Sequence, residues 1–135
     1  MDSKQFRELI APLLNNERDA HHGDVQYFSL SKLPEGAVEI EKSFIAKSEI
    51  SGHSHAVCGD YKMFELDGRR FLAVGEDGAT MNHVSNSMLT KEYFDENVQV
   101  KGHDHGPDVL APGIYFVGIQ NKIDPYKGTF ERVRD

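Results

Sequence analysis

The chain has 135 residues and a formal net charge of −7. A chain of this length buries about two-thirds of its unfolded surface, so we expect one domain over residues 1–135. The negative charge, without a lysine or arginine cluster, argues against nucleic acid and anionic membranes as partners, and no stretch approaches the roughly 20 apolar residues of a membrane helix. Cys58 is the only cysteine, which excludes an intrachain disulfide. The N-terminal residues do not pair a basic segment with a long apolar run, as a secretory signal would. We therefore expect a cytoplasmic protein.

The N-terminal segment has the pattern of an amphipathic helix. Asp2 or Ser3 can cap it, and Asn15-Asn16 can end it. Pro12 weakens the last turn, because proline has no backbone N–H and crowds the carbonyl four residues earlier. A polar linker follows, so residues 1–24 are predicted to be helix and linker. The apolar positions have the spacing of one helix face: Phe6, Leu9, Ile10, Leu13 and Leu14.

Beyond residue 24 the sequence changes to short β-branched and aromatic segments separated by glycine, proline and aspartate. This texture predicts an all-β sandwich or small barrel, and we favour a barrel. The segments are "VQYFSL", "AVEIEKSFIA", "YKMFEL", "RRFLAV", "IYFVGI" and "TFERV".

The clearest local structure is the hairpin "YKMFEL-DG-RRFLAV". Asp67-Gly68 supplies the two positive-φ residues of a two-residue turn whose twist suits a hairpin. "GEDG" at 75–78 predicts the next turn. The first turn sets the register of the hairpin, which pairs Leu66 with Arg69, Glu65 with Arg70, Phe64 with Phe71, and Met63 with Leu72.

Residues 84–104 differ from the β segments around them. "TKEYFDEN" within this stretch has the pattern of one or two helical turns. We therefore predict that 84–104 is a loop inserted between β segments, and such loops are often lids or binding loops.

Four of the seven histidines form two His-x-His pairs, His53 with His55 and His103 with His105. Alternate residues of a strand share a face and lie roughly 6.6–6.8 Å apart, so two imidazoles can bind one metal ion at about 2.0–2.1 Å. Two such pairs from separate strands of a closed barrel would offer four neutral nitrogen donors, which suit zinc, iron, nickel or copper better than magnesium or calcium.

Regular alternation also supports a structural role for these histidines. In a straight strand "VQVKGHDH", His103 and His105 would lie on the polar face with Gln99 and Lys101, and only a bulge at Gly102 would turn them inward. The face that carries His53 and His55 is either a polar barrel interior or plain surface.

Other residues have alternative readings too. His83 is an additional ligand, a base, or a hydrogen-bonded structural residue, and Glu49 is a candidate general base or carboxylate ligand. Alternation puts Cys58 on the face opposite His55, which favours a small buried residue over a ligand. His21-His22 lie in the predicted linker, where we expect them to be solvated.

Three motifs give the chain a resemblance over roughly residues 50–125: "GHSH", "ATMNH" and "HGPDVLAPGIY". They resemble motifs of a group of small uncharacterised bacterial and phage-type proteins, in which the last two are joined as Ala-Thr-x-x-His-x-x-His-Gly-Pro. The resemblance implies that 84–104 is an insertion. It also implies a metal cluster of His53, His55, His83 and His105, with His103 as a substitute. The group implies no activity.

"GHSH" also looks like the His-x-His of cupins, small β-barrels that often hold a metal ion. Two features depart from the cupin pattern. The usual glutamate a few residues later is not at its expected place, and Pro-Gly follows the later histidine instead of preceding it. A different β-barrel or β-sandwich is the main alternative.

Two functional hypotheses follow. In the first, a small β-barrel binds a divalent transition metal through His53, His55, His83, His103 and His105, and the metal assists a reaction on a small molecule. In the second, the protein is a non-catalytic interaction or oligomerisation module, such as a phage-type accessory protein, and its histidines are structural. The second hypothesis predicts a homo-oligomer without stoichiometric metal.

Overall fold

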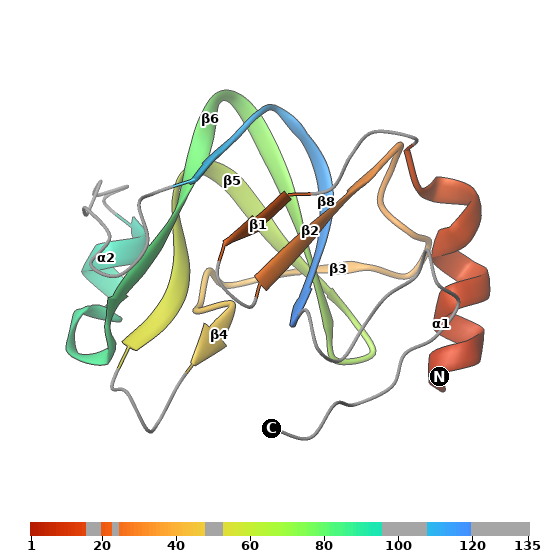
Figure 1. Ribbon diagram of the computed structural model, residues 1–135, viewed down its shortest axis with the longest axis horizontal. Coiled ribbons are helices and arrows are strands. Elements are labelled where there is room, and N and C mark those ends of the chain that lie inside the picture. The colour runs from red at the N-terminus through yellow and green to blue at the C-terminus, as the bar shows by residue number, and fades with distance from the viewer. Residues whose placement is uncertain (16–19, 23–24, 48–52, 96–107, 120–135) are drawn as a thin grey trace.

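The computed structural model describes residues 1–15, 20–22, 25–47, 53–95 and 108–119 (Figure 1). All β ladders within these ranges are antiparallel and belong to one sheet. The elements in chain order are α1 (Ser3–Ile10), the 3-10 turn η1 (Ala11–Leu13), β1 (Ala20–His22), β2 (Val25–Leu30), β3 (Val38–Ile40), β4 (Ala46–Lys47), β5 (His53–Leu66), β6 (Arg69–Ser85), the 3-10 turn η2 (Asn86–Met88), α2 (Lys91–Asp95), β7 (Asp108–Leu110) and β8 (Gly113–Ile119). An all-β fold with a short N-terminal helix is therefore confirmed.

Helix α1 begins where the sequence predicts. Asp2 Oδ1 accepts a hydrogen bond from the backbone N–H of Gln5 (2.7 Å), and Gln5 Oε1 accepts one from the N–H of Asp2 (2.9 Å). This reciprocal capping box satisfies two donors that a helix N-terminus would otherwise leave unpaired. At the other end the α-helix gives way to a 3-10 turn that contains Pro12, as expected for a residue without an N–H.

The hairpin of β5 and β6 has the predicted register. Asp67 and Gly68 have φ angles of 51° and 79°, which match a two-residue turn with positive φ at both positions. The four predicted cross-strand pairs all occur, and the ladder continues through Lys62 with Ala73 to Tyr61 with Val74. The local turn chemistry was therefore sufficient to determine this part of the sheet.

The predicted turn at "GEDG" is wrong, because β6 runs through residues 75–78 as one strand. Tyr61 pairs with Val74, and the next pair is Gly59 with Ala79, so four residues of β6 lie opposite Asp60 alone. This is a large β-bulge of the kind called bent or special, and Gly59 and Gly78 provide its positive φ angles of 118° and 74°. The glycines that predicted a chain reversal instead bend a continuous strand.

The bulge divides the β5–β6 ladder into two arms. The proximal arm, next to the Asp67-Gly68 turn, comprises residues 61–66 and 69–74, and it pairs with β8 and β3. The distal arm comprises residues 53–59 and 79–85, and it pairs with β7 and β4. In Figure 1, β6 rises along one arm, bends at the top of the molecule and descends along the other.

The sheet has the order β1-β2-β8-β6-β5-β3, with β4 added to β5 and β7 to β6. No ladder among the described strands joins β1 to β3, so within the described ranges the sheet is strongly bent but open. A barrel-like or sandwich-like fold fits this arrangement, and the cupin resemblance stays a prediction.

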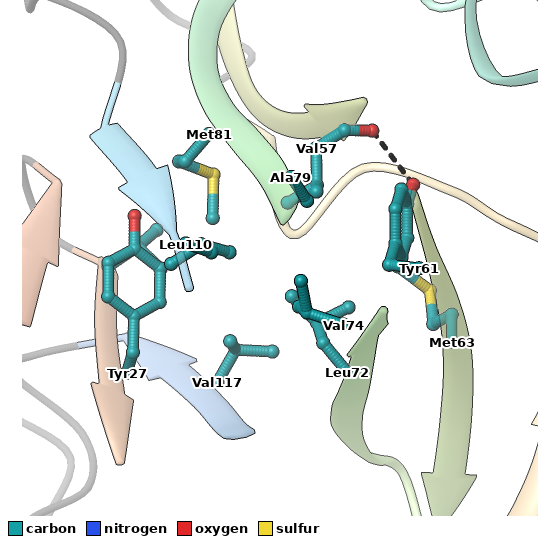
Figure 2. Close-up of a cluster of buried hydrophobic side chains, with 11 residues drawn as sticks. Tyr27, Val57, Tyr61, Met63, Leu72, Val74, Ala79, Met81, Leu110 and Val117 are labelled. Carbon is teal, nitrogen blue, oxygen red and sulfur yellow. Dashed lines mark hydrogen bonds between the residues drawn. The ribbon is translucent and has the colours of Figure 1, made fainter. Parts of the chain in front are cut away.

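The two arms enclose a core between their concave faces, which we call the inner core. Figure 2 shows Val57, Ala79 and Met81 of the distal arm opposite Leu72 and Val74 of the proximal arm. The Tyr61 hydroxyl donates a hydrogen bond to the Val57 carbonyl oxygen (2.8 Å), which joins the arms across the bulge. Burial raises the pKa of Tyr61 well above its ordinary value. The remaining members of the inner core are Val25, Tyr27, Met63, Leu110 and Val117.

A row of phenylalanines crosses the outer face of the proximal arm. Phe28 of β2 pairs with Phe116 of β8, Phe116 pairs with Phe71 of β6, and Phe71 pairs with Phe64 of β5. Helix α1 covers this row with Phe6 and Ile10, both fully buried. The apolar face of α1 thus packs on the sheet, as its sequence pattern predicts.

Three predicted boundaries differ from the structure. Part of the predicted linker forms the edge strand β1, in which His21 pairs with Gln26. "AVEIEKSFIA" forms two short strands, β3 and β4, separated by a crossover segment. Val84 and Ser85 belong to β6, so the excursion starts after Ser85, and α2 confirms its helical turn. "TFERV" and "VQVKGHDH" lie outside the described residues. No described helix is long and apolar enough to cross a membrane.

Candidate functional site

The structure brings together three of the five predicted metal ligands at the backbone level. His55 of β5 pairs directly with His83 of β6, and His53 pairs with Ser85. His53 and His55 are two residues apart on one strand, so the three histidines occupy neighbouring positions of one ladder. We call these three residues the histidine row.

The bulge is the reason for this pairing. The register set by the Asp67-Gly68 turn, if continued without interruption, would place Thr80 opposite His55. Between the pairs Tyr61–Val74 and Gly59–Ala79, β6 advances by five residues while β5 advances by two. The extra residues of β6 bring His83 opposite His55 instead.

The histidine row continues the inner face of the distal arm. Val57 pairs with Met81, two ladder positions from the pair of His55 and His83, and both residues are fully buried in the inner core. His55 itself is 8% exposed. The face that carries His55 is therefore an interior face, which answers the question that the sequence left open between barrel interior and plain surface.

The backbone of His55 is held on both sides. Ala46 of β4 pairs with it on one side and His83 on the other, and the His55 carbonyl accepts a hydrogen bond from the N–H of Ile45 (2.7 Å). A ligand carried by a doubly paired strand is placed more precisely than one carried by a loop.

The spacing generally expected of such ladder positions is compatible with a shared metal ion. Residues directly opposite in an antiparallel ladder have Cβ atoms about 4.5–5.5 Å apart, and imidazole nitrogens bind zinc at about 2.0–2.1 Å. Among the side chains that the structure describes, no three of histidine, cysteine, aspartate and glutamate come together. The side chains of His53 and His83 are not among them, and Glu49, His103 and His105 lie outside the described residues.

Cys58 lies on the opposite face of β5 from His55, as predicted, and is fully buried. It packs with Ala56, Val84 and Phe94 beneath α2. This environment confirms the prediction of a small buried residue.

Asn82 is a buried polar residue that the sequence analysis did not single out. Its Nδ2 donates hydrogen bonds to Cys58 Sγ (3.3 Å) and to the Tyr93 hydroxyl (3.2 Å), and its Oδ1 has no hydrogen-bond partner among the described residues. The available signal was its place in "TMNHV", where alternation puts it on the face opposite the inward-facing Met81. Its burial there depends on α2, which the local sequence pattern does not place. This polar group ties α2 to the distal arm.

Tyr93 predicts how stability responds to alkaline pH. Burial is the main cause that raises its pKa to about 12, and the neighbouring Cys58 acts in the same direction, while the hydrogen bond from Asn82 opposes it. Because the folded pKa exceeds the unfolded value near 10, the contribution of Tyr93 is complete below pH 10 and is lost between about pH 10 and 12. As the pH rises through this interval, we expect the urea concentration at the unfolding midpoint to fall less for Tyr93→Phe than for the wild type. Equal declines would contradict this assignment.

The fold and the histidine row define a class: a small all-β protein with a bent antiparallel sheet and histidines at adjoining ladder positions. The chain belongs to the family described as Domain of unknown function (DUF8820), whose model matches residues 21–120. All seven histidines lie within the matched residues, whereas α1 precedes them. Neither the comparison with curated proteins nor that with solved structures found a match.

Proposed function

We propose that this protein binds a divalent transition metal ion, zinc, iron, nickel or copper, through His53, His55 and His83. The observation that carries the proposal is the ladder pairing of His55 with His83, two residues from His53 on the same strand. His55 and His83 are far apart in the sequence, and their pairing requires the long bulge. A second supporting observation is the interior location of His55, where water competes less for a metal ligand.

The donor set fits such an ion. Neutral imidazoles suit zinc and its neighbours in the first transition series, and three protein ligands leave a coordination position open to water or a small substrate. The bound ion would polarise that molecule, which is the basis of metal-assisted reactions on small molecules. His103 and His105 remain predicted additional ligands, and Glu49 remains a predicted general base.

The test combines metal analysis with thermal melting. Protein purified without added metal or chelator should contain near-stoichiometric transition metal, and chelation should lower its melting temperature. A ligand at a hundred times its dissociation constant stabilises the native state by about 2.7 kcal/mol, which for this chain length corresponds to a shift on the order of 10 °C.

His53→Ala and His83→Ala should abolish this metal-dependent shift, and their metal-free forms should melt close to the metal-free wild type. His22→Ala is the matched control, because β1 lies at the other end of the sheet order from β5. Stoichiometric metal retained by the double variant His53→Ala, His83→Ala would refute the site.

A second candidate function is that of a non-catalytic binding or oligomerisation module. The observation in its favour is the exposure of two valines on short strands, Val38 of β3 (64% exposed) and Val109 of β7 (80% exposed). β3 is the last strand in the sheet order, and such edges can pair with another chain. Metal-free protein that forms a stable oligomer in light scattering would favour this function over metal binding.

A further inference from the structure

A cleft of about 640 Å³ lies between two segments that flank β5. One wall is formed by residues 39–44, which comprise the end of β3 and most of the crossover segment to β4. The other wall is formed by residues that lead into and belong to α2. Small-molecule sites typically have volumes of about 300–1,000 Å³, so the cleft has the size of a ligand site. His55 does not line it, and Phe94, which does, packs on the opposite face of β5 from His55.

Both walls are held in place by the sheet. Arg70 of β6 donates a hydrogen bond from Nη1 to the Phe44 carbonyl oxygen (2.6 Å), which fixes the crossover segment. On the other wall, Tyr93 and Phe94 of α2 are 4% and 7% exposed, and they pack with Ala56, Cys58 and Val84 of the distal arm. Their rings meet edge to face at 5.0 Å between centroids. The cleft is therefore formed before any ligand arrives, which lowers the entropic cost of binding.

Two hydroxyl groups on opposite walls are arranged to donate. Ser43 Oγ accepts a hydrogen bond from Arg70 Nη1 (3.3 Å), and Thr90 Oγ1 accepts one from the N–H of Tyr93 (3.3 Å). A hydroxyl has one proton to donate besides its lone pairs, so each of these groups keeps its proton for a further acceptor. Such a pair selects a ligand group that accepts hydrogen bonds.

The charges of the cleft refine the choice of ligand. Lys42 and Lys91 line it together with Glu39 and Glu41, so the formal charges balance. Both glutamates are exposed, whereas Lys42 is half-buried with its Nζ 4.4 Å above the Tyr61 ring. Among the charged groups of the first wall, the ammonium of Lys42 is thus the more enclosed.

We propose that this cleft binds a small organic carboxylate with an aromatic or branched apolar body. The carboxylate accepts from Lys42 and from the hydroxyls of Ser43 and Thr90, and the apolar body lies against Phe44, Leu89 and Phe94. This site is separate from the histidine row and does not depend on metal binding there.

The test is a titration with phenylpropionate that is monitored through the amide chemical shifts of the protein. The buffer contains a chelator, so that no metal ion at the histidine row can bind the carboxylate. We expect saturable shifts confined to residues 39–44 and 89–94, with a dissociation constant of about 1 mM or lower. Phenylpropanol and phenylpropylamine, which share the apolar body, should each bind at least about tenfold more weakly, because they lack the anionic acceptor.

Lys42→Gln should raise the dissociation constant for phenylpropionate about tenfold and leave that for phenylpropanol nearly unchanged. Lys62→Gln is the matched control, since Lys62 is an exposed lysine of β5 that does not line the cleft. The proposal is overturned if no saturable shift occurs in the cleft, if the amine binds better than the carboxylate, or if the two lysine variants behave alike.

Discussion

Replacing Phe116 with alanine is expected to lower the free energy of unfolding by about 3–5 kcal/mol, the usual cost of truncating a fully buried phenylalanine. Phe116 is 0% exposed and lies at the centre of the phenylalanine row. Its ring centroid is 5.0 Å from that of Phe6, 5.4 Å from that of Phe71 and 5.7 Å from that of Phe28. One substitution therefore leaves a cavity that α1, β2 and β6 all line.

Urea unfolding followed by circular dichroism measures this loss. Phe64→Ala is the internal control, because Phe64 lies at the end of the same row and is only partly buried. Its truncation should cost clearly less than that of Phe116, since solvent already reaches the site. If both variants lose the same small amount, α1 does not cover the row in solution as described.

The second large effect is expected for Gly59→Ala at the bulge. Gly59 has φ +118°, and a Cβ atom at this position would lie 2.8 Å from Ala79 Cα and 2.9 Å from the Gly78 carbonyl oxygen. Backbone strain and overpacking each cost about 1–3 kcal/mol, and both contacts are with backbone, which cannot rotate away. We expect a loss of about 3 kcal/mol or more in the free energy of unfolding.

Gly68→Ala separates strain from steric conflict. Gly68 also has a positive φ of 79°, but a Cβ atom there would meet no atom within 4 Å. It should therefore cost only the left-handed backbone penalty, about 1–2 kcal/mol. Equal losses for the two alanine variants would argue against close packing of β5 on β6 at the bulge.

Gly59→Ala also tests the link between the bulge and the proposed metal site. The bulge shifts the register that brings His83 opposite His55. Material of this variant that remains folded should therefore show a smaller metal-dependent rise in melting temperature than the wild type. Gly68→Ala, at the far end of the proximal arm, should keep the full rise.

Much of the local structure follows from neighbouring residues in the sequence. The cap of α1 needs only Asp2 and Gln5, and the first six pairs of the hairpin need only the turn at Asp67-Gly68. The burial of Cys58 on the face opposite His55 follows from strand alternation. Each of these features depends on interactions over a few residues, so a local pattern contains the necessary information.

The sequence by itself determined an all-β chain with an N-terminal helix, the hairpin register and the histidines as candidate ligands. Only the tertiary structure decided that "GEDG" is a bulge within β6, because glycines permit a turn and a bulge equally and packing of the two arms around the inner core selects between them. It also decided that His55 pairs with His83, because this register depends on how many residues the bulge absorbs. The same holds for the cleft, whose walls are each held by long-range contacts with the sheet that no local pattern contains.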